Sequence, residues 1–213
     1  MAIIDDDVFT GKLRGKFGGC IVYKRLGKTC IRSCPGSRKL TDAGQIAQQR
    51  RISSLNIFYK ALKFAGLAKC WNDAEKPAGW SGYNLFISKN ISAFAPNGFI
   101  GDAEKVCLTV GTGIYLPDEL IIRQTGEGTW VLTWKNVTCY PSGDAGDRMV
   151  LALMQGRNRF AIKIFDEAGV ACRHDECAEF KLPAAWQGYV HLYCFMRSES
   201  GMVSECKYFL LNG

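Results

Sequence analysis

The sequence predicts an α+β protein, in which an N-terminal β-hairpin and two helices are followed by an antiparallel β-sandwich of the immunoglobulin or fibronectin type. The 213 residues are 47% hydrophobic and 22% charged, a composition typical of a globular protein with a substantial core. Apolar residues recur every three or four positions between residues 52 and 94, and alternate with a period of two beyond residue 100. This change of period predicts a basic hairpin-plus-helices region at 1–99 and a β-sandwich domain at 100–213.

The hairpin is expected from residues 18–25 and 28–33. Both segments are short and contain β-branched residues, and Gly27 between them can adopt the positive φ that a tight turn requires. The sequence CPGS at 34–37 then ends strand pairing. The preceding residues 11–19 are rich in glycine, which indicates a sharp bend or a close approach of the backbone.

Two helices are expected after the hairpin. Thr41 offers an N-cap and Asp42 a first-turn acid for the first, and Gly66 is a natural stop for it. A loop through residues 72–79 follows, and Ser81 can cap the second, shorter helix. The residues expected to share one face are Ile52, Leu55, Tyr59 and Leu62 in the first helix, and Tyr83, Ile87, Asn90 or Ile91, and Phe94 in the second.

Seven or eight short strands without intervening helices are expected beyond residue 100, a pattern typical of an antiparallel sandwich. Turn residues separate them. Trp130, Leu132 and Trp134 alternate with Val131 and Thr133, so two tryptophans are expected to face one core. The expected strands are 105–111, 120–125, 129–135, 148–155, 159–165, 177–182, 189–197 and 204–211.

Positive charge is concentrated in the first half of the chain, although the whole chain has a formal net charge of only +7. Residues 11–76 hold 15 Lys and Arg against three acids, a net of +12. Residues 77–213 hold 12 against 14, a net of −2, and the three aspartates of the first ten residues add −3. A basic half of this kind favours a polyanion such as nucleic acid, an acidic protein partner, or simply a well-solvated surface.

Three motifs run through the N-terminal half: GKFGGCIVYKRLGKTCIRSCP (15–35), TDAGQIAQQRRISSLNIF (41–58) and SGYNLFISKN (81–90). Together with WKN at 134–136 and VSECKYFL at 203–210, this succession resembles an uncharacterised family of proteins from Bacteroidetes. The resemblance implies an N-terminal hairpin, a helix and a C-terminal sandwich, and it implies no reaction. The positions that carry it are Gly15, Lys16, Gly18, Arg32, Pro35, Thr41, Gln45, Ala47, Gln48 and Arg50.

The cellular compartment is expected to be the cytoplasm. The opening sequence MAIIDDDVFTG has aspartates where a secretory signal carries Lys or Arg, and no apolar run reaches the roughly 18–20 residues of a membrane span. Ten cysteines are fewer than a disulfide scaffold needs. Because Cys20, Cys107 and Cys194 lie within apolar runs, we expect reduced thiols in the core.

No cofactor is expected. Residues 11–17, GKLRGKF, are one residue short of a phosphate-binding loop and have Phe17 where Ser or Thr must bind magnesium. Cys172, His174 and Cys177 could supply three zinc ligands, but their spacing is not that of a paired zinc motif and a fourth ligand is missing. The alternative is that both cysteines are strand residues and His174 is an exposed turn residue.

The sequence favours a protein that is not an enzyme. His174 and His191 are its two histidines. A dyad of His191 with Cys194 is disfavoured, because residues three apart in a strand point to opposite faces. The pairs of acids, such as Asp166 and Glu167, fall in or near expected turns and define no general acid.

Two binding functions remain, and neither identifies a small-molecule substrate. The first is a non-catalytic structural or protein-interaction protein, an adaptor or assembly module that binds a protein partner or a second copy of itself. The second is a nucleic-acid or other polyanion-binding module, in which Phe17 and Tyr23 either stack on bases or belong to the packing of the hairpin. Its candidate residues are Lys12, Arg14, Lys16, Lys24, Arg25, Lys28, Arg32, Arg50 and Arg51.

Overall fold

The structure is a computed structural model that describes residues 2–4, 14–25, 27–36, 42–136, 143–155, 160–165, 171–182, 186 and 189–212. The chain forms two compact units, Met1–Gln45 and Ile46–Gly213. Helices and antiparallel sheets are both present, so the α+β class is confirmed. The division between the units lies after Gln45, whereas the sequence predicts it after residue 99.

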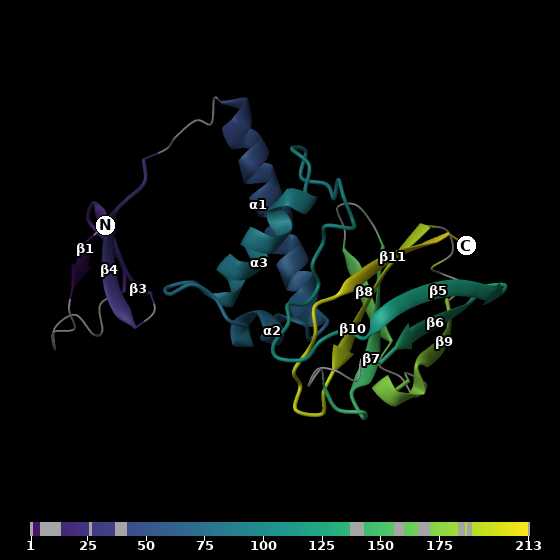
Figure 1. The fold of residues 1–213 in the computed structure, drawn as a ribbon. Helices are drawn as coiled ribbons and strands as arrows, with labels where there is room; N and C mark the ends of the chain where they lie inside the picture. Colours follow the sequence, from purple (N-terminus) through teal and green to yellow (C-terminus); the bar gives the residue numbers. More distant parts are fainter. Residues whose placement is uncertain are drawn as a thin grey trace. The chain divides into compact units, whose positions relative to one another are not determined.

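The first unit contains one antiparallel four-stranded sheet with the order β1-β4-β3-β2 (Figure 1). The predicted hairpin is confirmed as β3 and β4, with Gly27 at a φ of +80° in the turn. The glycine-rich stretch before it adds β2 along the outer edge of β3, and the start of the chain adds β1 beside β4. The strands are β1 (Ala2–Ile4), β2 (Gly15–Phe17), β3 (Cys20–Arg25) and β4 (Lys28–Ser33).

The helices are α1 (Ala43–Phe64), α2 (Ala68–Asp73) and α3 (Gly82–Asn90), followed by the 3₁₀ turn η1 (Ile91–Ala93). The predicted cap at Ser81 is confirmed, whereas the side chain that caps α1 is Asp42 and Thr41 lies outside the described residues. Asp42 Oδ2 accepts a hydrogen bond from the Gln45 amide at 3.0 Å, and Ser81 Oγ accepts one from Asn84 at 3.2 Å. The sequence did not predict α2, which is too short to show a period.

Two further antiparallel sheets follow the helices. One has the order β11-β10-β7-β8 and the other the order β5-β6-β9. The strands are β5 (Asp118–Gly126), β6 (Thr129–Lys135), β7 (Arg148–Gln155), β8 (Ala161–Phe165), β9 (Cys177–Lys181), β10 (Tyr189–Arg197) and β11 (Lys207–Asn212). A short 3₁₀ turn, η2 (Arg173–Asp175), precedes β9.

The strand predicted at 105–111 is wrong, because this segment is an irregular loop. Its backbone bonds to a side chain rather than to a neighbouring strand. Asn90 accepts a hydrogen bond from the Cys107 amide at 2.9 Å and donates one to the Cys107 carbonyl at 3.2 Å. An apolar run buried in this way has the same composition as a buried strand.

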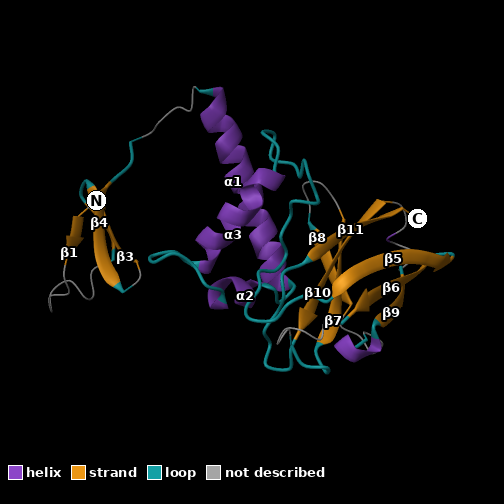
Figure 2. Cartoon of the chain, in the orientation of Figure 1, coloured by secondary structure: helices purple, strands orange, loops and turns teal. Residues whose placement is uncertain are grey.

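The helices pack on one face of the β11-β10-β7-β8 sheet (Figure 2). Phe58 of α1 and Phe86 of α3 are fully buried in the same cluster as Val150 and Phe195 of that sheet. Burial of one such side chain stabilises a fold by about 1.5–3 kcal/mol. The helices therefore belong to the same unit as the sheets, which explains why the division lies after Gln45.

The opposite face of this sheet packs against β5, β6 and β9. Trp130, Leu132 and Trp134 of β6 are buried in one cluster with Leu151 of β7 and Leu192 of β10. The prediction that both tryptophans face one core is confirmed. The second unit thus has three layers, which are the helices, a four-stranded sheet and a three-stranded sheet (Figure 1).

The cysteines differ in burial more than the sequence predicts. Cys194 is buried, but Cys20 is exposed and Cys107 is half-buried, so the expectation of core thiols is wrong for Cys20. Cys20 pairs with Phe17 in the small N-terminal sheet, where Phe17 is itself 52% exposed. Among the described residues the cysteines are free thiols. No described helix has the length and apolarity of a membrane span.

Candidate functional site

The register of the N-terminal sheet gathers cationic side chains on one face. Residues paired directly across an antiparallel sheet share a face, and successive residues alternate between faces. Lys16 pairs with Ile21, which pairs with Arg32. We name the face that carries Lys16, Tyr23, Arg25, Lys28 and Arg32 the basic face.

The cations of the basic face form two rows. Lys16 and Arg32 lie in one row, and Arg25 lies directly opposite Lys28 in the other. Four residues of strand separate the two rows, which corresponds to about 13 Å at 3.3–3.4 Å per residue. A single small anion cannot contact both rows, whereas an extended polyanion can.

Tyr23 lies between the two rows, paired with Cys30. It is half-buried, and the Arg32 guanidinium carbon lies 5.8 Å from the centre of its ring. A guanidinium over an aromatic ring makes a cation–π contact. The basic face therefore combines an aromatic ring with exposed cations.

The formal charge of residues 14–36, which contain β2, β3 and β4, is wholly positive. Residues 14–36 contain six Lys and Arg and no Asp or Glu. Lys16, Arg25, Lys28 and Arg32 are all exposed. Like charges directly opposite each other in a sheet are destabilising, and an anion bound beside Arg25 and Lys28 would relieve this repulsion.

The structure does not bring together all nine predicted cations. Lys12 lies outside the described residues, and Arg14 is exposed immediately before β2. Lys24 alternates with Arg25 along β3, so it lies on the opposite face. Arg50 and Arg51 belong to α1 in the second unit, where Arg50 is exposed and Arg51 is half-buried.

The two aromatic candidates also separate. Phe17 pairs with Cys20, which alternates with Ile21 and therefore places Phe17 on the face opposite Tyr23. Only Tyr23 accompanies the cations of the basic face. The sequence shows both aromatic residues among the cations, but pairing register decides which of them share a face.

Cys172 and His174, two of the three residues weighed above as zinc ligands, make other contacts. His174 is exposed in η2, with Nδ1 3.0 Å from the Ala145 carbonyl and Nε2 3.0 Å from Asp175 Oδ1. The Cys172 amide donates to Asp175 Oδ2 at 2.7 Å, which closes the same turn. Within the described ranges, no group of three His, Cys, Asp or Glu side chains has the arrangement of a metal site.

The side chain of His191 contacts a tyrosine rather than Cys194. Its Nδ1 lies 3.1 Å from Tyr208 Oη, on the next strand. Cys194 is buried in the core between the two larger sheets, and this burial raises the pKa of its thiol far above the ordinary value. The prediction that the two side chains point to opposite faces is confirmed, and this geometry forms no nucleophile–base pair.

Sequence reasoning missed two charged pairs in the second unit. Asp147 and Arg173 form a buried ion pair, and Arg148 and Arg197 lie directly opposite each other on β7 and β10. Both members of the second pair fall within predicted strands. Their proximity depends on strand register, which the sequence does not show.

Comparison of the chain with protein-family models, with curated proteins and with solved structures found no match. The resemblance to a Bacteroidetes family therefore stays a prediction that depends on the sequence motifs alone.

Proposed function

We propose that this is a non-catalytic binding protein whose N-terminal sheet binds an extended polyanion, such as single-stranded nucleic acid, through its basic face. The observation that carries this proposal is the register that gathers Lys16, Arg25, Lys28 and Arg32 around Tyr23.

Phosphate contacts supply most of the affinity in such a complex. Each cation that neutralises a phosphate releases a condensed counterion, and this release favours binding at low salt. Tyr23 adds a surface on which a base can stack, worth about 1–3 kcal/mol per base by alanine substitution. Because every base has an aromatic face, binding of this kind discriminates little between sequences.

The second unit supplies the scaffold in this proposal, and its seven strands form a fibronectin-like sandwich. Strand order supports this assignment. The first, second and fifth strands, β5, β6 and β9, make one sheet, and the other four make the second. Division of consecutive antiparallel strands between two packed sheets in this way is typical of immunoglobulin-like and fibronectin-like domains.

Assembly through a protein contact is the second candidate function. Ile57 is 51% exposed and Phe64 is 98% exposed, and their separation of seven positions corresponds to about two helical turns. They therefore share an outer face of α1. Two apolar side chains at this spacing favour pairing of α1 with a helix of a second copy.

Sedimentation equilibrium of the wild type and Phe64→Ser tests this function: a dimer that Phe64→Ser dissociates supports it, and a monomeric wild type contradicts it.

The polyanion proposal is tested by charge reversal at neighbouring positions. Arg25 and Lys24 are adjacent and both exposed, but only Arg25 lies on the basic face. Arg25→Glu and Lys24→Glu change the net charge equally, so they form a matched pair. Fluorescence anisotropy with a labelled oligothymidylate of about 20 nucleotides, longer than the sites of most single-strand binding folds, measures affinity for each variant.

The expected result is a loss of at least about tenfold for Arg25→Glu and a much smaller loss for Lys24→Glu, because only Arg25 contacts phosphate. Equal losses in the two variants would show that net charge alone attracts the strand. An unchanged affinity in Arg25→Glu would place the binding surface elsewhere.

A further inference from the structure

The second unit carries a pair of arginines that the proposed polyanion surface does not use. Arg148 is the first residue of β7 and Arg197 is the last of β10, and the two are directly paired across the sheet. Arg148 alternates with Met149, so it shares a face with Val150, which faces the helices. Arg197 shares that face in the same way with Phe195, and its guanidinium lies 5.9 Å from the centre of the Phe195 ring.

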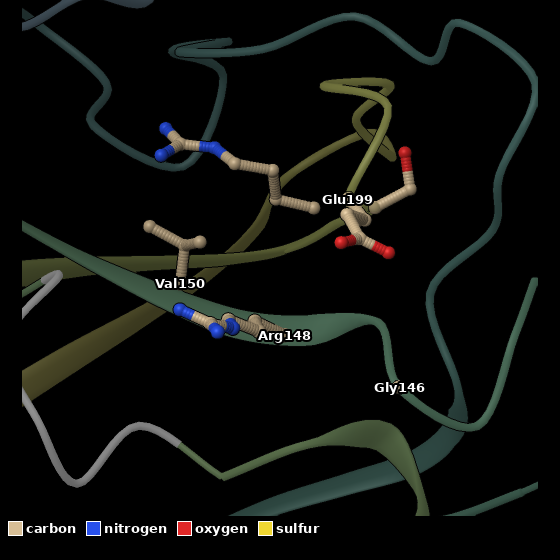
Figure 3. Close-up of a pocket in the computed structure, with 6 residues that line it drawn as sticks. Gly146, Arg148, Val150 and Glu199 are labelled. Carbon is tan, nitrogen blue, oxygen red and sulfur yellow. The ribbon is translucent and has the colours of Figure 1, made fainter.

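These arginines line a pocket with a volume of about 480 Å³ (Figure 3). The picture shows Arg148 and Val150 on one strand and Glu199 on the turn that follows the neighbouring strand. A volume of this size falls within the range of about 300–1,000 Å³ typical of small-molecule sites. The lining residues are Gly146, Arg148, Val150, Arg197, Ser198 and Glu199.

The charges in this pocket favour an anion. Like charges directly opposite in an antiparallel pair destabilise a sheet. Arg148 is exposed to the pocket and makes no ion pair with any residue that the structure describes. An oxyanion beside Arg148 compensates the charge of this side chain, and Arg197 on the neighbouring strand adds a second positive charge.

The arrangement of hydrogen-bond donors on the guanidinium group indicates which anions fit the pocket. Its fork of N–H donors matches the oxygens of phosphate and carboxylate, and arginine is favoured where such recognition is bidentate. Two such forks on adjacent strands present more donors than a single carboxylate can use. A phosphate group, with three terminal oxygens, matches them better.

The rest of the pocket indicates that the phosphate is part of a larger molecule. The volume exceeds what one phosphate ion fills, and Val150 supplies an apolar wall. Glu199 repels a bare anion but accepts a hydrogen bond from a hydroxyl group. We propose that this pocket binds a small hydroxylated phosphate monoester, with its phosphate held by Arg148 and Arg197 and a hydroxyl bound by Glu199.

Calorimetric titration of the full chain tests the proposal with two probes, glycerol phosphate and inorganic phosphate. Arg148→Gln removes one fork, and Arg123→Gln is the matched control, because Arg123 is exposed on β5 in the other sheet. We expect Arg148→Gln to weaken glycerol phosphate binding at least about tenfold and Arg123→Gln to leave it within about twofold, since only Arg148→Gln removes charge-assisted hydrogen bonds to the phosphate. Glycerol phosphate should also bind more tightly than inorganic phosphate.

Arg148→Lys is the control for a folding defect, because it keeps the positive charge but cannot make the bidentate hydrogen bonds of a guanidinium group. It should keep the wild-type melting temperature and still lose most of the glycerol phosphate affinity. Arg25→Glu, on the basic face of the first unit, should leave that affinity unchanged, which separates this proposal from the polyanion function. Absence of binding by the wild type, equal binding by Arg148→Gln, or equal affinity for the two probes would overturn it.

Discussion

Arg173 connects several segments of the second unit. Its Nη2 donates to the Tyr115 carbonyl at 2.7 Å, and its own carbonyl accepts from Trp134 Nε1 at 2.9 Å and from Asn136 at 2.9 Å. Its Nη2 also lies 3.5 Å from Asp147 Oδ2, which makes an ion pair without a close hydrogen bond. Both charged side chains are almost fully buried, so each depends on the other for compensation.

Removal of one member of this pair should therefore destabilise the protein strongly. Asp147→Ala leaves a buried guanidinium without its counter-charge, and we expect a loss of about 3–5 kcal/mol in the free energy of unfolding. The control is Asp102→Ala, which breaks an exposed pair with Lys105 and should cost about 0–1 kcal/mol. Urea denaturation measures both. A loss for Asp147→Ala no larger than for the control would contradict this account of the pair.

Thiol reactivity should follow burial at each cysteine. Burial raises the pKa of the Cys70 thiol to about 11, so this group is protonated at neutral pH. The protonated thiol is a poor nucleophile. We expect iodoacetamide to modify the exposed Cys20 and Cys177 in the native protein, and Cys70 and Cys194 only after unfolding. Peptide mass spectrometry distinguishes them, and fast native labelling of Cys194 would contradict the burial.

At the level of elements, the sequence predicts regular structure well where a period or a cap is present. The turn at Gly27, the cap at Ser81 and the alternation of Trp130 with Trp134 all depend on neighbouring residues. Segment 105–111 could not be predicted in this way, because its conformation depends on Asn90, which is distant in the sequence.

Substitution of Asn90 tests whether this residue determines the conformation of segment 105–111. It is fully buried and satisfies both backbone groups of Cys107. Asn90→Ala leaves buried backbone groups without partners, at about 1–3 kcal/mol each, so we expect a total loss of about 2–4 kcal/mol. Asn72→Ala, at an exposed position of α2, should change stability by less than about 0.5 kcal/mol. A cost for Asn90→Ala below about 1 kcal/mol would mean that packing alone holds the loop.

At the level of the whole molecule, the candidate site could be predicted from the sequence only in part. The excess of positive charge is a property of composition, and the sequence locates it in the first half of the chain. Composition cannot show that Lys24 and Arg25 lie on opposite faces, or that Arg50 belongs to a different unit from Arg32. Strand register and tertiary packing decide these positions.

The division into two units predicts that the second unit is stable by itself. Both large clusters of buried residues come from the second unit, beginning at Leu55 in one and Ile114 in the other. A chain that begins at Asp42 keeps the Asp42 cap of α1 and should unfold within about 1 kcal/mol of the full chain, since distant sites contribute almost independently. Urea denaturation checks this expectation, and loss of a cooperative transition would contradict it. The same shortened chain should lose oligothymidylate binding and keep glycerol phosphate binding.

The most direct test of the polyanion function is the salt dependence of oligothymidylate binding. For single strands the slope of log K against log salt is about −0.7 per phosphate neutralised, so the four cations of the basic face predict a slope of about −3. The double variant Arg25→Glu with Arg32→Glu should reduce its magnitude to about 1.4 or less, because two phosphate contacts are lost. A wild-type slope near zero, or an equal slope in the double variant, would contradict binding through the basic face.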